Sequence, residues 1–75
     1  MRFLYTDHVR LRIRQREMRT THIERTILAP EQTEPSFKLR TVVQRHFGSR
    51  TLEVVYRKLN SHVVIITAYW LDEGA

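Results

Sequence analysis

Three β-rich runs separated by two short turns fill the second half of the chain and constrain its fold most strongly. They span Phe37 to Phe47, Arg50 to Leu59 and His62 to Trp70. The pairs Gly48-Ser49 and Asn60-Ser61 between them are turn-forming, and runs of this length joined by such turns favour an antiparallel meander. Because the last run is apolar on both faces, we expect it to be the most buried strand.

The first third of the chain has the apolar spacing of a helix. That spacing extends from Asp7 or His8 to about Met18, and Thr6 or Asp7 is placed to cap the first free backbone amides. We therefore expect the chain to begin with a helix of about three turns.

A second, shorter helix is expected from Thr21 to about Leu28. Thr21 and Glu24 have the spacing of a capping box, in which each side chain satisfies the other residue's backbone amide. Pro30 ends the helix, because the residue before a proline is pushed out of the helical region. Two helices joined by so few residues are expected to form a helical hairpin.

Together these elements predict an α+β fold, with an N-terminal two-helix hairpin packed on a curled antiparallel sheet of three or four strands. The polar connector Gln32 to Ser36 has room for a short edge strand. At 75 residues the chain is expected to be a single domain over residues 1–75, and residues 71–75 are expected to fray.

Charged residues form a stripe along the first predicted helix. His8, Arg12 and Arg16 stand at positions i, i+4 and i+8, so they project from one helical face. Val9 and Ile13 lie beside the stripe, on the side that is expected to meet the core. Because a buried unpaired charge is costly, we expect the stripe to face compensating groups on the strands.

The overall charge is positive. The formal net charge is +5, and arginine, which binds phosphate in a bidentate fork, outnumbers lysine. A nucleic-acid partner is one interpretation, and a merely solvated basic surface is the other. There is no apolar run long enough to span a bilayer, and the first seven residues are too polar for a secretory signal, so we expect a cytoplasmic protein without a membrane partner.

The spacing of several elements resembles a bacterial and archaeal family of small uncharacterised domains. Members of that family begin with a His-x3-Arg-x3-Arg helix and end in a strand close to Val-x-Thr-x-Tyr. The matching positions are His8, Arg12, Ile13, Arg16, Met18, Ile23, Ile27, Pro30, Glu31, Leu52, Val54, Val55, Tyr56, Val64, Ile66, Thr67, Ala68 and Tyr69. The chain departs from the family at Glu17, where glycine is common, and at Arg19, where serine or threonine is common.

That family is similar to the RelE/ParE/BrnT-like toxins of toxin–antitoxin systems. The resemblance implies two helices on an antiparallel sheet and an acidic antitoxin-like protein as a partner. RelE-like members cleave messenger RNA on the ribosome, whereas ParE-like members inhibit a topoisomerase, so the resemblance alone does not fix the activity.

The residue types present are those that metal-independent RNA cleavage requires. A histidine exchanges protons near neutral pH, arginines stabilise the negative charge that builds up on the phosphoryl oxygens, and a tyrosine orients or stacks a base. The predicted catalytic residues are His8, Arg12, Arg16 and Tyr69. The predicted RNA-binding residues are Arg10, Arg14, Arg45, His46 and Arg57. We expect RNA or the ribosome as partner, and a homodimer is also compatible with the short chain.

Two other interpretations compete with an RNA-cleaving enzyme. The stripe fits a structural network in which Glu24 or Glu53 pairs with the arginines, and the domain fits a non-catalytic binding module of the same fold. The four histidines are spread along the chain without ligand spacing, so no metal or other cofactor is expected. A helix-turn-helix DNA reader is disfavoured because the second helix is short and a third helix is missing.

Overall fold

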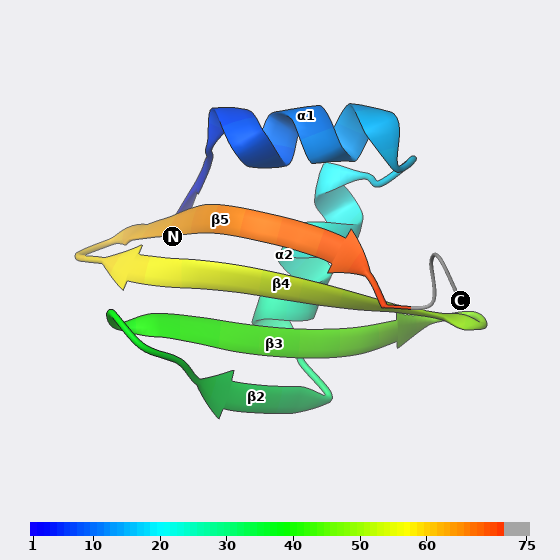
Figure 1. Ribbon diagram of the computed structural model, residues 1–75. Coiled ribbons are helices and arrows are strands. Elements are labelled where there is room, and N and C mark those ends of the chain that lie inside the picture. Colours follow the sequence, from blue (N-terminus) through cyan, green and yellow to red (C-terminus); the bar gives the residue numbers. More distant parts are fainter. Residues whose placement is uncertain (72–75) are drawn as a thin grey trace.

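The computed structural model describes residues 1–71 and consists of two helices and five strands (Figure 1). The expected fraying beyond residue 71 concerns residues outside this range. The elements follow in the order β1 (Arg2–Tyr5), α1 (Asp7–Gln15), α2 (Thr20–Leu28), β2 (Gln32–Pro35), β3 (Arg40–Phe47), β4 (Arg50–Leu59) and β5 (His62–Trp70).

The five strands form one mixed sheet in the order β1-β5-β4-β3-β2. The expected antiparallel meander of β3, β4 and β5 is confirmed, and the polar connector does carry the short edge strand β2. The expectation of a purely antiparallel sheet of three or four strands is wrong. β1 adds a fifth strand, which pairs in parallel with the first half of β5, from Arg2 opposite His62 to Tyr5 opposite Ile65.

β3 begins three residues later than the sequence predicts. Lys38 and Leu39 adopt φ angles of 60° and 61°, which are left-handed and incompatible with a strand. These two residues instead make the turn that joins β2 to β3, so the first predicted run contributes a strand only from Arg40.

The predicted cap of α1 is confirmed, but the helix ends earlier than expected. The Thr6 side chain accepts a hydrogen bond from the Val9 amide, and its hydroxyl donates to the carbonyl of Ile66 on β5. Glu17 adopts a φ of 55°, in the left-handed region that stops a helix, so α1 ends at Gln15 rather than near Met18. Thr6 therefore ties the start of α1 directly to the sheet.

The capping box predicted for α2 is wrong. The helix begins at Thr20, and its N-cap residue Arg19 makes no side-chain cap hydrogen bond. Glu24 instead accepts a hydrogen bond from the hydroxyl of Tyr5, on β1. The second helix is thus connected to the first strand through a side chain whose partner lies 19 residues earlier in the sequence.

The expected helical hairpin is not confirmed. α1 lies along the part of β5 that continues past the end of β1, whereas α2 lies behind β3 and β4 (Figure 1). The core fills the space between the helices and one face of the sheet. Its buried side chains are Val9, Met18, Ile23, Val43, Leu52, Val54, Val63, Ile65, Ala68 and Trp70. Neither helix in residues 1–71 has the length and apolar character needed to cross a membrane.

Candidate functional site

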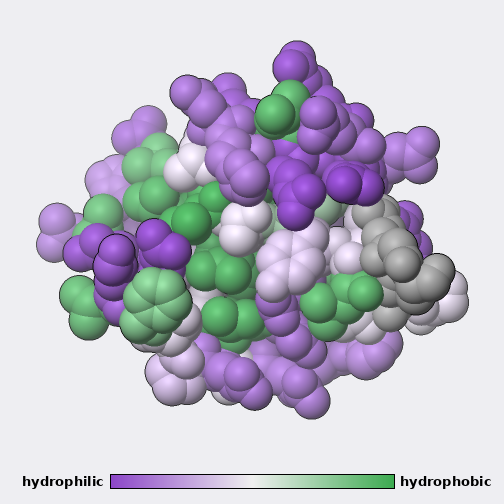
Figure 2. All heavy atoms as spheres, in the orientation of Figure 1, coloured by the Kyte–Doolittle hydropathy of each residue, from purple (hydrophilic) through white to green (hydrophobic). Residues whose placement is uncertain are grey.

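The face of the sheet that points away from the core is open. Within residues 1–71 neither helix covers it, because α1 lies along β5 and α2 packs on the other face (Figure 1). Side chains alternate between the two faces of a strand, so the neighbours of the buried residues Leu52 and Val54 point to this open face. Figure 2 shows that apolar groups gather here, bordered by hydrophilic side chains of α1. The residues of the open face include Gln44, Glu53, Val55, Thr67 and Tyr69.

The stripe on α1 reaches this face at its first member. Nε2 of His8 lies 3.1 Å from the hydroxyl oxygen of Thr67 on β5, and the imidazole stays exposed to solvent. Val9 beside it is fully buried in the core, which fixes the rotation of the helix about its axis. The expectation that the stripe turns toward the strands is therefore confirmed for His8.

Arg12 and Arg16 differ in their surroundings. Arg12 is half-buried, and its Nε atom is enclosed without a hydrogen-bond partner among the described residues. Arg16 is exposed and lies just beyond the helix, where its carbonyl oxygen accepts a hydrogen bond of 3.2 Å from the indole of Trp70. Of the two arginines in the stripe, Arg12 is therefore the more buried and Arg16 the more exposed.

Tyr69 belongs to a hydrogen-bonded group in the middle of the open face. Its hydroxyl donates to Oε2 of Glu53, which is directly opposite on β4. The second carboxylate oxygen, Oε1 of Glu53, accepts a hydrogen bond of 2.6 Å from the side-chain amide of Gln44 on β3. Three neighbouring strands therefore position one carboxylate on the uncovered side of the sheet.

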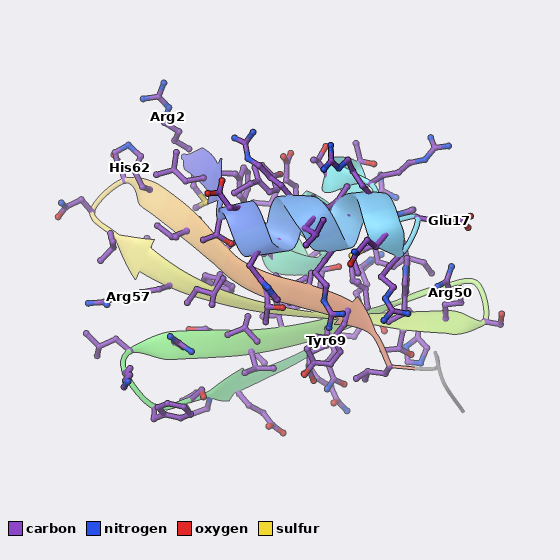
Figure 3. All side chains as sticks on the ribbon, turned by 45° about the horizontal axis from the view of Figure 1, so that its top comes forward. Arg2, Glu17, Arg50, Arg57, His62 and Tyr69 are labelled. Carbon is purple, nitrogen blue, oxygen red and sulfur yellow. The ribbon has the colours of Figure 1, made fainter. Side chains whose placement is uncertain are left out.

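These two groups of side chains are adjacent. Thr67, which contacts His8, and Tyr69, which contacts Glu53, lie two residues apart on the same face of β5, a separation of about 7 Å. In Figure 3 Tyr69 lies on β5 close beneath α1. We call the set His8, Arg12, Gln44, Glu53, Thr67 and Tyr69 the open-face cluster.

Two of the predicted RNA-binding residues lie on a different side of α1. Arg10 donates from Nε to the carbonyl of Tyr5, at 3.2 Å, and Arg14 lines the same largely apolar hollow together with Leu11 and Ile13. Tyr5 borders this hollow, and burial together with its hydrogen bond to Glu24 raises the pKa of its hydroxyl above the ordinary range. The structure therefore separates Arg10 and Arg14 from the open-face cluster.

The predicted binding residues on the strands are also dispersed. Arg45 points to the helix side, where its guanidinium donates to the carbonyl of Ala29 at 2.7 Å. His46 pairs with Glu31 at 2.7 Å, and this hydrogen bond lowers the pKa of that carboxyl below its ordinary value. By strand alternation His46 and Arg57 both belong to the open face, His46 two residues beyond Gln44 on β3 and Arg57 at the opposite end from Tyr69 (Figure 3).

Sequence reasoning missed the part that Glu53 and Gln44 play in this site. Glu53 was expected only as an ion partner for the stripe, whereas it accepts from Tyr69 and Gln44. The alternation of β4 does predict that Glu53 shares a face with Val55. Its neighbours on β3 and β5, however, depend on strand register, which the sequence pattern alone does not supply.

Within the described part of the chain, no three His, Asp or Glu side chains come together in a way that would hold a metal ion.

Comparison with known protein families gives a match between residues 5–70 and the family described as Domain of unknown function (DUF4258). No curated protein and no solved structure shows a significant match to the chain.

Proposed function

We propose, starting from the fact that the chain belongs to the DUF4258 family of domains of unknown function, that it binds RNA on its open face and cleaves it without a metal ion. The observation that carries the proposal is the open-face cluster itself. Helix α1 brings the imidazole of His8 to the uncovered surface on which the strands hold a carboxylate and a phenol, and Arg12 stands one helical turn further along α1. RNA cleavage needs this combination of a proton acceptor, a proton donor and a fixed cation.

The chemistry assigns a role to each member of the cluster. Glu53 accepts the proton of the ribose 2′-hydroxyl, whose oxygen then attacks the adjacent phosphorus. The bond from phosphorus to the 5′-oxygen breaks, and His8 in its protonated form gives its proton to that oxygen. The products are a 2′,3′-cyclic phosphate and a free 5′-hydroxyl, so no water, metal or oxidant is consumed.

Arg12 and Tyr69 stabilise the reaction without exchanging protons. The half-buried guanidinium of Arg12 is permanently cationic and is poised to bind the phosphoryl oxygens as their negative charge increases. The hydroxyl of Tyr69 holds Glu53 in place through its hydrogen bond. Arg16, which is exposed just beyond the end of α1, supplies positive charge along the path of the phosphate backbone.

The resemblance to RelE/ParE/BrnT-like toxins gives this proposal its biological context. Within it, we propose that the chain is the toxin-like member of a pair and that an acidic antitoxin-like protein binds it. The net charge of +5 supports an acidic partner.

The expected homodimer stays a prediction. Sedimentation equilibrium tests it, since the mass of a monomer would contradict a dimer.

One observation favours a non-catalytic binding module as the second candidate. His8 contacts Thr67, and both carboxylate oxygens of Glu53 already accept hydrogen bonds from Tyr69 and Gln44. A cluster satisfied in this way could bind an RNA or a protein target without transferring protons. In that case the arginines bind the target and the hydrogen bonds of the cluster only maintain the surface.

The two candidates differ in a cleavage assay on single-stranded RNA in the presence of EDTA. The RNase proposal predicts products with a 2′,3′-cyclic phosphate from the wild-type chain. It predicts a loss of rate of about 100-fold or more in His8→Ala and Glu53→Gln. His62→Ala is the matched control, because this histidine begins β5 outside the cluster. Intact RNA with the folded wild-type chain, or equal cleavage by His8→Ala, would contradict the enzyme.

A further inference from the structure

We propose that the tip of the β2–β3 hairpin is a second RNA subsite, at which the ring of Phe37 stacks on an unpaired base. This inference rests on the proposed function and deepens it, because it makes single-stranded RNA the preferred substrate. The site lies outside the open-face cluster. It includes Phe37, Lys38 and Arg40, together with Arg57 opposite Arg40 on the neighbouring strand β4.

The Phe37 ring is presented to solvent with cations around it. Phe37 is 70% exposed, so most of its ring is accessible to a ligand. The Lys38 ammonium and the Arg40 guanidinium lie 6.0 Å and 5.8 Å from the ring centroid. An exposed ring next to two cations is the combination that binds a base and its phosphates at the same time.

The backbone holds this tip in a conformation that ordinary residues avoid. Lys38 and Leu39 both have left-handed φ angles near 60°, and neither is a glycine or an asparagine. Such strain is retained where the surrounding structure or a function requires it. Here the turn leaves both Phe37 and Leu39 outside the core, with Leu39 79% exposed.

Two arginines extend from the tip onto the open face, on the side of the cluster. Arg40 is opposite Arg57 in the register of β3 and β4, and both belong to the open face. Arg57 is half-buried, and its Nε atom has no hydrogen-bond partner among residues 1–71. Along β4, Arg57 lies four residues from Glu53, or about 13 Å. One strand of RNA can therefore follow the open face from the cluster, past Arg57, to the tip.

The arrangement favours RNA over a lipid surface or a flat protein interface. A lipid anchor would use Phe37 and Leu39 alike, because burial of apolar area is not specific for aromatic rings. The cations, in contrast, gather on the ring of Phe37 and continue toward the open-face cluster. A duplex cannot use the tip, because its bases are already stacked on one another, so unpaired RNA is the expected ligand.

The test measures binding of a fluorescein-labelled, 2′-O-methyl single-stranded RNA by fluorescence anisotropy. This RNA lacks the attacking hydroxyl, so cleavage does not affect the result. We expect Phe37→Ala to weaken binding by about fivefold or more, and Phe37→Trp to restore it. Leu39→Ala is the matched control on the same tip, and we expect it to change binding by less than about twofold.

Three results would overturn the subsite. They are an absence of binding by the wild-type chain, unchanged binding in Phe37→Ala, and equal losses in Phe37→Ala and Leu39→Ala. Equal losses would indicate an apolar docking surface, and sedimentation with phosphatidylglycerol vesicles then shows whether it binds lipid. Cleavage of unmodified RNA by the wild type and its loss in His8→Ala report on the proposed function separately. A chain that cleaves but does not need Phe37 for binding would contradict the subsite alone.

Discussion

His22 stands in surroundings that disfavour its protonated form. Its ring packs against Phe47 and Trp70, at centroid distances of 4.8 Å and 5.7 Å, and its Nδ1 atom is enclosed without a partner in the described part of the chain. Burial lowers the pKa of the imidazole, and the nearby charges of Arg19, Arg25 and Arg50 lower it further. Protonation of His22 would therefore place a charge among aromatic rings and guanidinium groups.

This environment predicts a loss of stability in mild acid. Because the folded-state pKa of His22 lies below its ordinary value of 6.5, the unfolded chain binds the proton at the higher pH. The contribution of His22 to the free energy of unfolding is thus fully present above pH 6.5 and is lost as the pH falls toward the folded-state pKa. Urea denaturation at several pH values should show a smaller acid-induced loss in His22→Gln, and an identical loss in both chains would contradict the prediction.

Single residues also show where sequence reasoning stops. His8 could be assigned to the strand side from helical spacing alone, because Val9 beside it had to be buried. Arg45 could not be assigned, since its contact with the carbonyl of Ala29 depends on where α2 ends relative to β3. Glu53 was visible only as a possible ion partner, because its contacts with Tyr69 and Gln44 require strand register.

At the scale of elements, α1 is the segment on which the site depends. It has nine residues, which is too short for independent stability in water, so tertiary contacts must hold it. Val9 anchors its first turn in the core, and Thr6 anchors its start through hydrogen bonds with the Val9 amide and the Ile66 carbonyl. The position of His8 on the open face follows from these two anchors.

We therefore expect Thr6→Ala to reduce the free energy of unfolding by about 1 kcal/mol, through loss of the helix cap. Thr6→Ser keeps the hydroxyl and is expected to retain most of that stability. Chemical denaturation followed by circular dichroism measures both. A Thr6→Ala chain as stable as the wild type would show that the cap does not hold α1.

The elements were predicted unevenly for physical reasons. The antiparallel strands β3, β4 and β5 follow from their alternation and from the short turns between them, which are local signals. β1 was missed because its four residues, Arg2–Tyr5, acquire a strand partner only from the distant β5. The end of α1 was misplaced because Glu17 takes a left-handed backbone angle without the glycine that usually announces one, whereas α2 ends at Leu28 as expected.

For the molecule as a whole, one layer of core joins the helices to the sheet, and the other side of the sheet remains open. A chain of 75 residues has little apolar surface to bury, so each core residue carries a large share of the stability. The α+β class was predictable from the order of the elements. The placement of the two helices was not, because it depends on which stretch of β5 the short β1 leaves free.

Ile23 tests how closely the fold depends on α2. It is fully buried behind the sheet, so Ile23→Ala should lower the free energy of unfolding by about 2 to 5 kcal/mol. Leu28 lies on the same helix but is 63% exposed, and Leu28→Ala is expected to cost much less. Equal urea midpoints for the two variants would contradict the proposed core.

The central claim is that RNA binds the open face beside α1, and nuclear magnetic resonance tests it most directly. In a titration of the isotope-labelled chain with 2′-O-methyl single-stranded RNA, the largest amide shift changes are expected near His8, Glu53, Thr67 and Tyr69. The amides of Tyr5 and Thr20, which line the hollow on the other side of α1, should change little. The absence of shift changes, or changes centred on that hollow, would contradict the account.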